Sequence, residues 1–434
     1  MNLTHSSSHS ETAHSPRRIL ARIFSQQRFT VSLVIAASTI FAFAPSITPQ
    51  NGKAVGQDPI LQHESKPWTG GTADSAIRAS KAGSTIPLST YSISVTKDNE
   101  RKPRTGTIVG TSPFASNLSG STINVVIIPM VITIGNSVFD PTAPNPVGCG
   151  DSSSGATPID RFMASPLVVP VPDLTFNGVN VGTSQFTDGF MRAEFWNTIS
   201  AAGKNPANYS NPMSFSVANP IYINPGSSGI TTDPAANPCL LGAVSDSFLS
   251  TELRHQLQVL TTAKVISTTQ VAFFMMTNVT LSTATPPTLP GTPTCCIGGY
   301  HTATGTTPQF WGVFNYNTRA VIDGVATGTD TLIASHELAE FMNDPLGNNG
   351  TPLWGGVGQV ASGACQGNLE VADPLTGTYG TIVLNNYTYR LQEMAFFSWF
   401  FNSPSTPSLG AGGKYSSNGT FAGPSKICPP GGTN

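Results

Sequence analysis

The stretch Ile123–Ile134, INVVIIPMVITI, decides the fold class of the chain. Its residues are almost all apolar and many are β-branched, which is typical of a strand that is buried on both faces. Pro129 lies inside the stretch and cannot donate a ladder hydrogen bond, so we expect it at a sheet edge or a bulge. The stretch therefore predicts a buried strand.

The composition also favours strands. The 434 residues include 42 Gly and 35 Pro, and only 10% of them are charged, against about 25% in a typical domain. Long helices are therefore disfavoured, whereas 39% hydrophobic residues suffice for one large core or two smaller ones. We expect an α+β fold that is rich in strands and loops.

Further strands are expected on both sides of this stretch. In residues 91–95 apolar side chains alternate with serines, and residues 107–109 can form a second strand after a polar turn. This pattern predicts a hairpin. Residues 381–384 and 387–390 predict another pair of strands. Tyr389 lies in the last of them, where its hydroxyl is a candidate oxyanion donor or an ordinary strand side chain.

Three helices are expected. Two of them rest on an apolar face, 189–199 with Asp188 as a possible N-cap and 246–260 with leucines at helical spacing. The third is 331–343, with Asp330 as N-cap and Asp344 before Pro345 as the stop.

The N-terminal region is predicted to be an export signal. Residues 1–54 contain five basic residues and one acidic residue, a net charge of +4, and an apolar run at 29–44. Sixteen residues are short for a membrane span of about 20 but suit a signal peptide. We expect a signal peptide over 1–54, with an uncleaved membrane anchor as the alternative.

The rest of the chain is predicted to have three parts: a polar linker at 55–84, a β-rich part at 85–290, and a metal-site part at 291–434. Beyond residue 54 the net charge is −6, because 16 basic and 22 acidic residues remain. Without a basic stripe, nucleic acid is not expected as a partner.

Six cysteines agree with an oxidising compartment: Cys149, Cys239, Cys295, Cys296, Cys365 and Cys428. An even number in an exported chain predicts up to three disulfides. Cys295 and Cys296 are adjacent, so we expect them to bond to different partners. Thiolate metal binding is the alternative, but no C-x-x-C spacing supports it.

The third expected helix, TLIASHELAEFMN, carries the motif His336-Glu337-Leu338-Ala339-Glu340. On a helix, His336 and Glu340 project from one face about 6 Å apart and can share a cation, with Glu337 beside them. No Lys or Arg occurs between residues 320 and 389 to pair with these carboxylates. A bound cation is therefore expected, and an exposed acidic helix face is the alternative.

This H-E-x-x-E motif differs only in its last residue from the zinc-peptidase motif H-E-x-x-H. With Glu370 and Asp373 downstream, residues 330–373 resemble the gluzincin-type zincin metallopeptidases. The resemblance implies zinc held by His336, Glu340 and Glu370. It also implies that Asp373 accepts the other ring N–H of His336, and that Glu337 is the general base. The chain departs from the family in Glu340, where a His is usual, and in the three-residue spacing from Glu370 to Asp373.

A broader resemblance involves Gly298-Gly299-Tyr300-His301, 335–340, 343–345 and 369–373. This order resembles a group of bacterial exported proteins of unassigned function, and 298–344 is faintly similar to the plant exordium (phosphate-induced) proteins. The resemblance indicates that these motifs belong to one structural unit. Together with the predicted signal peptide, it leads us to expect a secreted, periplasmic or cell-surface bacterial protein.

Two residues near the motif have open roles. His301 is a candidate ligand or transition-state hydrogen-bond donor, or a loop histidine bonded to backbone. Asp344 could accept a hydrogen bond from a ligand or could only end the helix.

Two functions are compatible with these features. The first is an exported metal-dependent hydrolase, a zinc metallopeptidase acting on a peptide or protein. The second is a β-rich binding protein with a structural cation and no catalysis. A carboxylate beside the ligands, Glu337, favours the hydrolase because a structural site does not need a base. Manganese, iron and calcium are alternatives to zinc. The sequence predicts no oligomeric state, and it predicts membrane contact only through an uncleaved N-terminal segment.

Overall fold

The computed structural model describes residues 48–50, 86–95, 104–147, 149, 154–232, 239–289, 295–305, 307–318, 330–354, 366–401, 409 and 414–422. All of them belong to one compact unit, Ala44–Asn434. The predicted signal segment lies outside the described residues except for β1 (Thr48–Gln50), and so does the predicted linker at 55–84.

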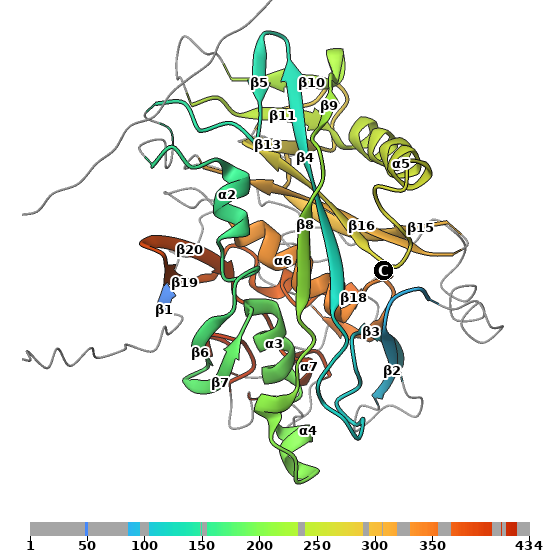
Figure 1. Ribbon diagram of the computed structural model, residues 1–434, viewed down its shortest axis with the longest axis vertical. Coiled ribbons are helices and arrows are strands. Elements are labelled where there is room, and N and C mark those ends of the chain that lie inside the picture. The colour runs from blue at the N-terminus through green and yellow to red at the C-terminus, as the bar shows by residue number, and fades with distance from the viewer. Residues whose placement is uncertain are drawn as a thin grey trace, which may run out of the picture. The chain divides into compact units, whose positions relative to one another are not determined.

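A seven-stranded sheet forms the centre of the fold (Figure 1). Five strands follow the order β15 (Gly299–Thr304), β16 (Gln309–Tyr316), β12 (Val271–Thr277), β4 (Ile123–Ile134) and β5 (Ser137–Phe139). Strands β8 (Met213–Val217) and β9 (Ile221–Ile223) also pair with β4. The strands β16, β12, β4 and β8 run parallel, whereas β15 is antiparallel to β16. Both predicted parts, 85–290 and 291–434, thus contribute strands to one sheet.

Strand β4 is the buried strand that the sequence predicts. Pro129 was expected at an edge or a bulge, and β4 is not an edge strand, because it pairs with β12 and β8 at the same residues, 125–127. Pro129 lies where one neighbour of β4 changes: β8 pairs with 123–127 and β9 with 130–132. A proline is tolerated there because neither of these two strands pairs with it.

Side chains alternate across this sheet and form a core on each face. Phe273 of β12 and Phe314 of β16 pack in the same core as the helix α6 (Leu332–Asn343). The next residue on β12, Phe274, packs in the other core with the helix α5 (Asp246–Thr262). The two helices therefore cover opposite faces of the sheet, and the whole of α6 is buried.

The other strands form small sheets, which confirms the expected strand-rich α+β class. The predicted hairpin is β2 (Thr90–Val95) with β3 (Arg104–Val109), and the predicted C-terminal pair is β19 (Tyr379–Leu384) with β20 (Tyr387–Gln392), to which β1 adds. The remaining strands are β6 (Val171–Phe176), β7 (Val179–Ser184), β10 (Gly229–Thr231), β11 (Gly242–Ser245), β13 (Val279–Ser282), β14 (Cys295–Ile297), β17 (Gly350–Trp354) and β18 (Gln366–Asn368).

The helix predictions hold with changes at the ends. The helix expected at 246–260 is α5, and its predicted leucines are buried. The helix expected near 189–199 is two helices, α3 (Phe186–Glu194) and α4 (Trp196–Ala201). Asp188 does not cap α3 but lies in its first turn, where its carboxylate pairs with Arg192 at 2.9 Å. The short helices are α2 (Pro158–Met163), α7 (Phe397–Phe400), η2 (Pro206–Asn208), η3 (Gly226–Ser228) and η4 (Asp373–Leu375).

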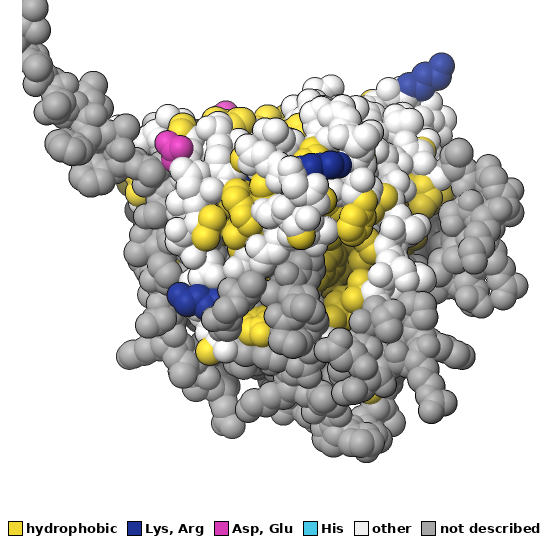
Figure 2. All heavy atoms as spheres, turned by 90° about the horizontal axis from the view of Figure 1, so that it is seen from below, with side chains coloured by type: hydrophobic (Ala, Val, Ile, Leu, Met, Phe, Trp, Pro, Cys, Tyr) yellow, Lys and Arg dark blue, Asp and Glu magenta, His cyan; other side chains and the backbone are white. Residues whose placement is uncertain are grey.

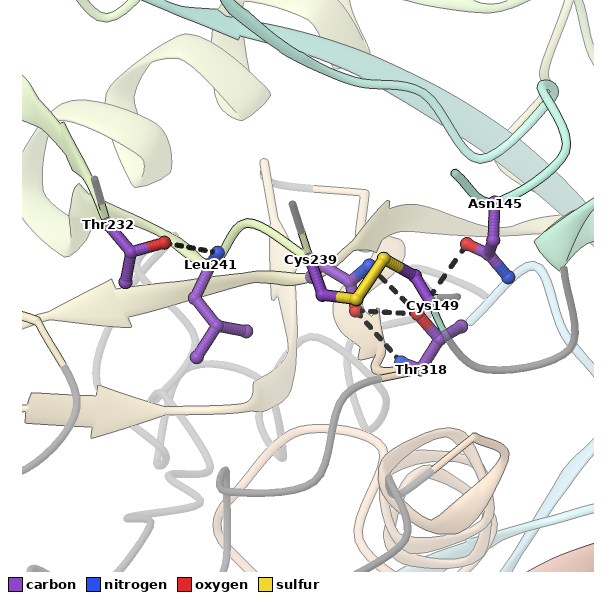
Figure 3. The surroundings of a disulfide bond; sticks show 7 residues. Asn145, Cys149, Thr232, Cys239, Leu241 and Thr318 are labelled. Atoms are coloured by element: carbon purple, nitrogen blue, oxygen red, sulfur yellow. Dashed lines mark hydrogen bonds between the residues drawn. A yellow bond between two sulfur atoms is a disulfide. The ribbon is translucent and has the colours of Figure 1, made fainter. Parts of the chain in front are cut away.

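Two disulfides lie among the described residues. Cys149 and Cys239 are joined at an S–S distance of 2.04 Å, beside Asn145 and Thr318 (Figure 3). The loop that this bond closes has a sequence separation of 90 residues, for which loop entropy alone gives about 4.6 kcal/mol of stabilisation. Cys295 and Cys296 are bonded to each other, so the prediction that they take different partners is wrong. Cys365 and Cys428 lie outside the described residues.

Charged side chains are sparse and scattered on the face shown in Figure 2. On that face, the described part of the chain shows no histidine, consistent with the burial of His301 and His336. Among the described helices, none combines the length and apolar character that are needed to cross a membrane.

Candidate metal centre

Helix α6 presents the motif in a fixed orientation against β20. It begins one residue later than predicted: Thr331 is the N-cap, and Asp330 instead pairs with Arg390 of β20 at 2.8 Å. Farther along, the backbone N–H of Gln392 donates to Ser335 Oγ at 2.8 Å. These contacts tie the turn that precedes His336 to a strand.

His336 and Glu340 meet on one face of α6, as the spacing predicts. His336 Nε2 lies 3.0 Å from Glu340 Oε2. The other carboxylate oxygen, Glu340 Oε1, accepts the backbone N–H groups of Ala372 at 3.1 Å and Asp373 at 3.2 Å. Glu340 therefore holds the downstream segment in place with one oxygen and faces the imidazole with the other.

Asp373 reaches the same nitrogen of His336. Its Oδ1 lies 3.3 Å from His336 Nε2, the atom that also faces Glu340. The resemblance to gluzincins implied that Asp373 accepts the other ring N–H of His336. In this geometry Asp373 instead faces the same ring nitrogen as Glu340, so that two carboxylate oxygens converge on one imidazole nitrogen.

Glu370 lies beside this group. Its Oε1 accepts a hydrogen bond of 2.6 Å from Asn368 Nδ2, and its carboxyl is close enough to that of Glu340 to share a hydrogen bond. The predicted ligand is therefore within reach of the centre, held by an amide that the sequence analysis did not single out.

His301 comes to the cluster from β15, on the face of the sheet that α6 covers. Its Nε2 is 2.9 Å from the backbone oxygen of Asp344, which can only accept, so Nε2 carries the hydrogen. Its Nδ1 lies 3.5 Å from Glu337 Oε2 and 3.9 Å from Glu340 Oε2. Nδ1 is buried and has no hydrogen-bond partner.

The remaining candidate residues are Asp344 and Tyr389. Asp344 ends α6, and its side-chain carboxylate accepts the backbone N–H groups of Asn348 and Asn349 at 2.8–3.0 Å. Tyr389 is buried in β20, with its ring 4.7 Å from that of Tyr387.

Burial sets the charge state of the cluster. It lowers the pKa of His301 to about 4 and that of His336 to about 3, so both imidazoles are neutral at pH 7. Burial also raises the pKa of Glu340 to about 8. The pKa of Glu337 is raised well above its usual value by burial and by the neighbouring Glu340 and Glu370. Neutral imidazoles cannot offset these carboxylates, so either protons or a cation must.

The donor atoms fit a divalent cation. His336, Glu340 and Asp373 form one group whose donor atoms lie within 4.8 Å of one another, and His301, Glu337 and Glu340 form another. An ion about 2.0–2.2 Å from each donor would separate tetrahedral donors by about 3.3–3.6 Å. The separations of 3.0 and 3.3 Å around His336 Nε2 are close to this.

Gly299 makes room for Glu337. A Cβ at this position would lie 2.8 Å from Glu337 Oε1 and 2.6 Å from the backbone oxygen of Val313. We predict that Gly299→Ala destabilises the fold by about 1–3 kcal/mol, because the strand backbone cannot yield easily. Urea denaturation measures this loss. Gly350→Ala is the matched strand control, since its nearest contact would be 3.8 Å away; an equal loss in both variants would contradict the prediction.

Sequence reasoning assigned no role to Gly299, Asn368 or the backbone amides of residues 372 and 373. Gly299 precedes a candidate ligand strand, and Asn368 lies two residues before Glu370, but neither has a spacing signal of its own. Their roles depend on pairing between distant segments.

We also compared the chain with models of protein families, with curated proteins and with solved structures, and found no significant match.

Proposed function

We propose that the chain is an exported bacterial metal-dependent hydrolase, a zinc metallopeptidase that acts on a peptide or protein. His336, Glu340 and Asp373 would hold the ion, with Glu370 beside them, and Glu337 would be the general base. The observation that carries the proposal is the convergence of Glu340 Oε2 and Asp373 Oδ1 on His336 Nε2, at 3.0 and 3.3 Å, inside the protein.

A divalent ion at this place would supply Lewis-acid polarisation of water and of a carbonyl oxygen. Two carboxylates and one imidazole suit zinc, and they also suit manganese or iron. Calcium fits less well because it prefers oxygen donors alone.

Glu337 supports catalysis in particular. It follows His336 directly on α6, and its carboxylate is not part of the donor group formed by His336, Glu340 and Asp373. It can therefore accept the proton of a water and return it to the leaving amine. The cation would also offset the neighbouring carboxylates that raise the pKa of Glu337, which favours the ionised form that a base needs.

A peptidase assay tests the proposal. The purified full chain should cleave unfolded protein or a mixed peptide library, lose this activity with a chelator and regain it with Zn²⁺. If no peptide or protein is cleaved in the zinc-loaded state, the peptidase assignment is wrong.

Burial favours a second candidate, a structural cation in a binding protein without catalysis. His301, His336 and Glu337 are 0% exposed, Glu340 and Glu370 are 1% exposed, and Asp373 is 2% exposed. An ion in such surroundings stabilises the fold whether or not a substrate reaches it. In that case the chelator would lower the melting temperature and no turnover would accompany the bound ion.

Both candidates share one prediction about the ligands. We expect His336→Ala and Glu340→Ala each to release the ion at His336, because each removes one of three protein donors. Metal analysis after gel filtration measures the loss. His255→Ala is the control, since His255 lies on α5 with its side chain 64% exposed. Retention of the ion at His336 in both variants would show that the cation is bound elsewhere.

A further inference from the structure

In their ionised forms, Glu337 and Glu340 face His301 with no hydrogen to share with its Nδ1. Its Nε2 hydrogen is used by the backbone oxygen of Asp344, and Nδ1 lies 3.5 Å from Glu337 Oε2 and 3.9 Å from Glu340 Oε2. Both distances are too long for a hydrogen bond. Three atoms with lone pairs therefore lie within 4.8 Å of one another inside the protein.

A water molecule is a poor occupant of this space. It has two hydrogens for three acceptors, and it brings no charge to offset two carboxylates. A divalent cation satisfies all three atoms at once, and imidazole nitrogen with carboxylate oxygen is a donor set that transition-metal ions take.

The ion at His336 cannot also be the one at His301. Among the described residues, no group of donor atoms within 4.8 Å of one another contains both imidazoles. An ion bound to both at about 2.1 Å would bring the two nitrogens within about 4.2 Å. The two imidazoles therefore require separate ions.

Glu340 belongs to both groups. Its Oε2 lies 3.0 Å from His336 Nε2 and 3.9 Å from His301 Nδ1. Carboxylates that bridge two ions about 3.5–4 Å apart occur in two-metal hydrolases. Two divalent ions would also match the charge of the four buried carboxylates Glu337, Glu340, Glu370 and Asp373.

We propose that His301, Glu337 and Glu340 form a second divalent-cation site, and that Glu340 bridges it to the ion at His336. The second site shares Glu340 with the proposed function but does not require catalysis. Glu337 also serves as the base in that function, so variants of His301 test the second site.

Manganese is a suitable probe, because two coupled Mn²⁺ ions give a paramagnetic resonance spectrum with half the hyperfine spacing of an isolated ion. The full chain, loaded with Mn²⁺ and desalted, should hold two ions per chain and show the coupled spectrum. His301→Ala should hold one ion with the isolated spectrum, and the control His255→Ala should behave as the wild type.

A wild-type protein with a single ion, or with two ions that are not coupled, would overturn the proposal. The wild-type spectrum decides this even if His301→Ala does not fold, and His301→Asn offers a smaller change of volume. Two coupled ions without peptide cleavage would support the second cation site and contradict the peptidase assignment. Peptide cleavage by a protein that holds one ion would support the peptidase assignment and contradict the second site.

Discussion

Replacing Glu337 by Gln is expected to lower hydrolysis by about 10²- to 10⁴-fold, the usual contribution of a general base. The amide keeps the size of the side chain but cannot accept the proton of a water. The fold and the ion at His336 should remain, because Glu337 is not among the donors around His336 Nε2. Steady-state kinetics and metal analysis on the same preparation separate these effects.

Two other glutamates sharpen this test. Glu370→Gln should weaken metal binding, because a neutral amide is a poorer partner than a carboxylate for a divalent ion next to Glu340. Glu252→Gln, on the outer face of α5, should change neither property. Full activity in Glu337→Gln would remove Glu337 as the base, and unchanged metal affinity in Glu370→Gln would remove Glu370 from the site.

The second large effect is a loss of stability when the chelated protein is taken from pH 6.5 to pH 8. Without an ion, the folded state raises the pKa of Glu340 from 4.5 to about 8, so it binds a proton that the unfolded chain has released. This contribution to stability is complete below pH 4.5 and disappears as the pH rises through about 8.

The imidazoles act in the opposite direction but mainly at lower pH. Their pKa values of about 4 and 3 in the fold lie below the ordinary value of 6.5, so the unfolded chain still releases about half a proton per imidazole between pH 6.5 and 8, which adds roughly 0.4 kcal/mol of stability each. Between pH 6.5 and 8 the carboxyls have the larger effect, because one proton over this range corresponds to about 2 kcal/mol, against about 0.8 kcal/mol for the two imidazoles together.

Urea denaturation at both pH values measures this difference, with disulfides intact. The metal-loaded protein should not lose stability, because the ion takes the place of the protons. In chelated Glu340→Gln the loss should be smaller, since the amide does not titrate. A chelated wild type that is equally stable at pH 6.5 and 8 would contradict the charge state assigned to the cluster.

Much of the fold follows from local patterns in the sequence. Strand β4 and the helices α5 and α6 were predicted because their patterns of apolar residues, caps and stops are contained in the segments themselves. The approach of His336 to Glu340 is likewise a property of one helical turn.

Features that depend on distant segments were not predictable. Pro129 was expected at an edge or a bulge, because the sequence does not reveal that β8 and β9 divide one side of β4 between them. His301 reaches the cluster because β15 pairs with β16 in a register that turns its side chain toward α6. The position of Asp373 on His336 Nε2 depends on backbone amides that bind Glu340. The bond between Cys295 and Cys296 also went against the expectation from adjacency.

The central claim is that this buried cluster of imidazoles and carboxylates is a metal site. Elemental analysis of the full chain, purified without exposure to chelators, tests it most directly. The account predicts at least one equivalent of zinc, manganese or iron per chain, and two equivalents when both sites are filled. The His336→Ala substitution should reduce this metal content. A folded, correctly disulfide-bonded protein without stoichiometric divalent metal, and unable to take up any on titration, would contradict it.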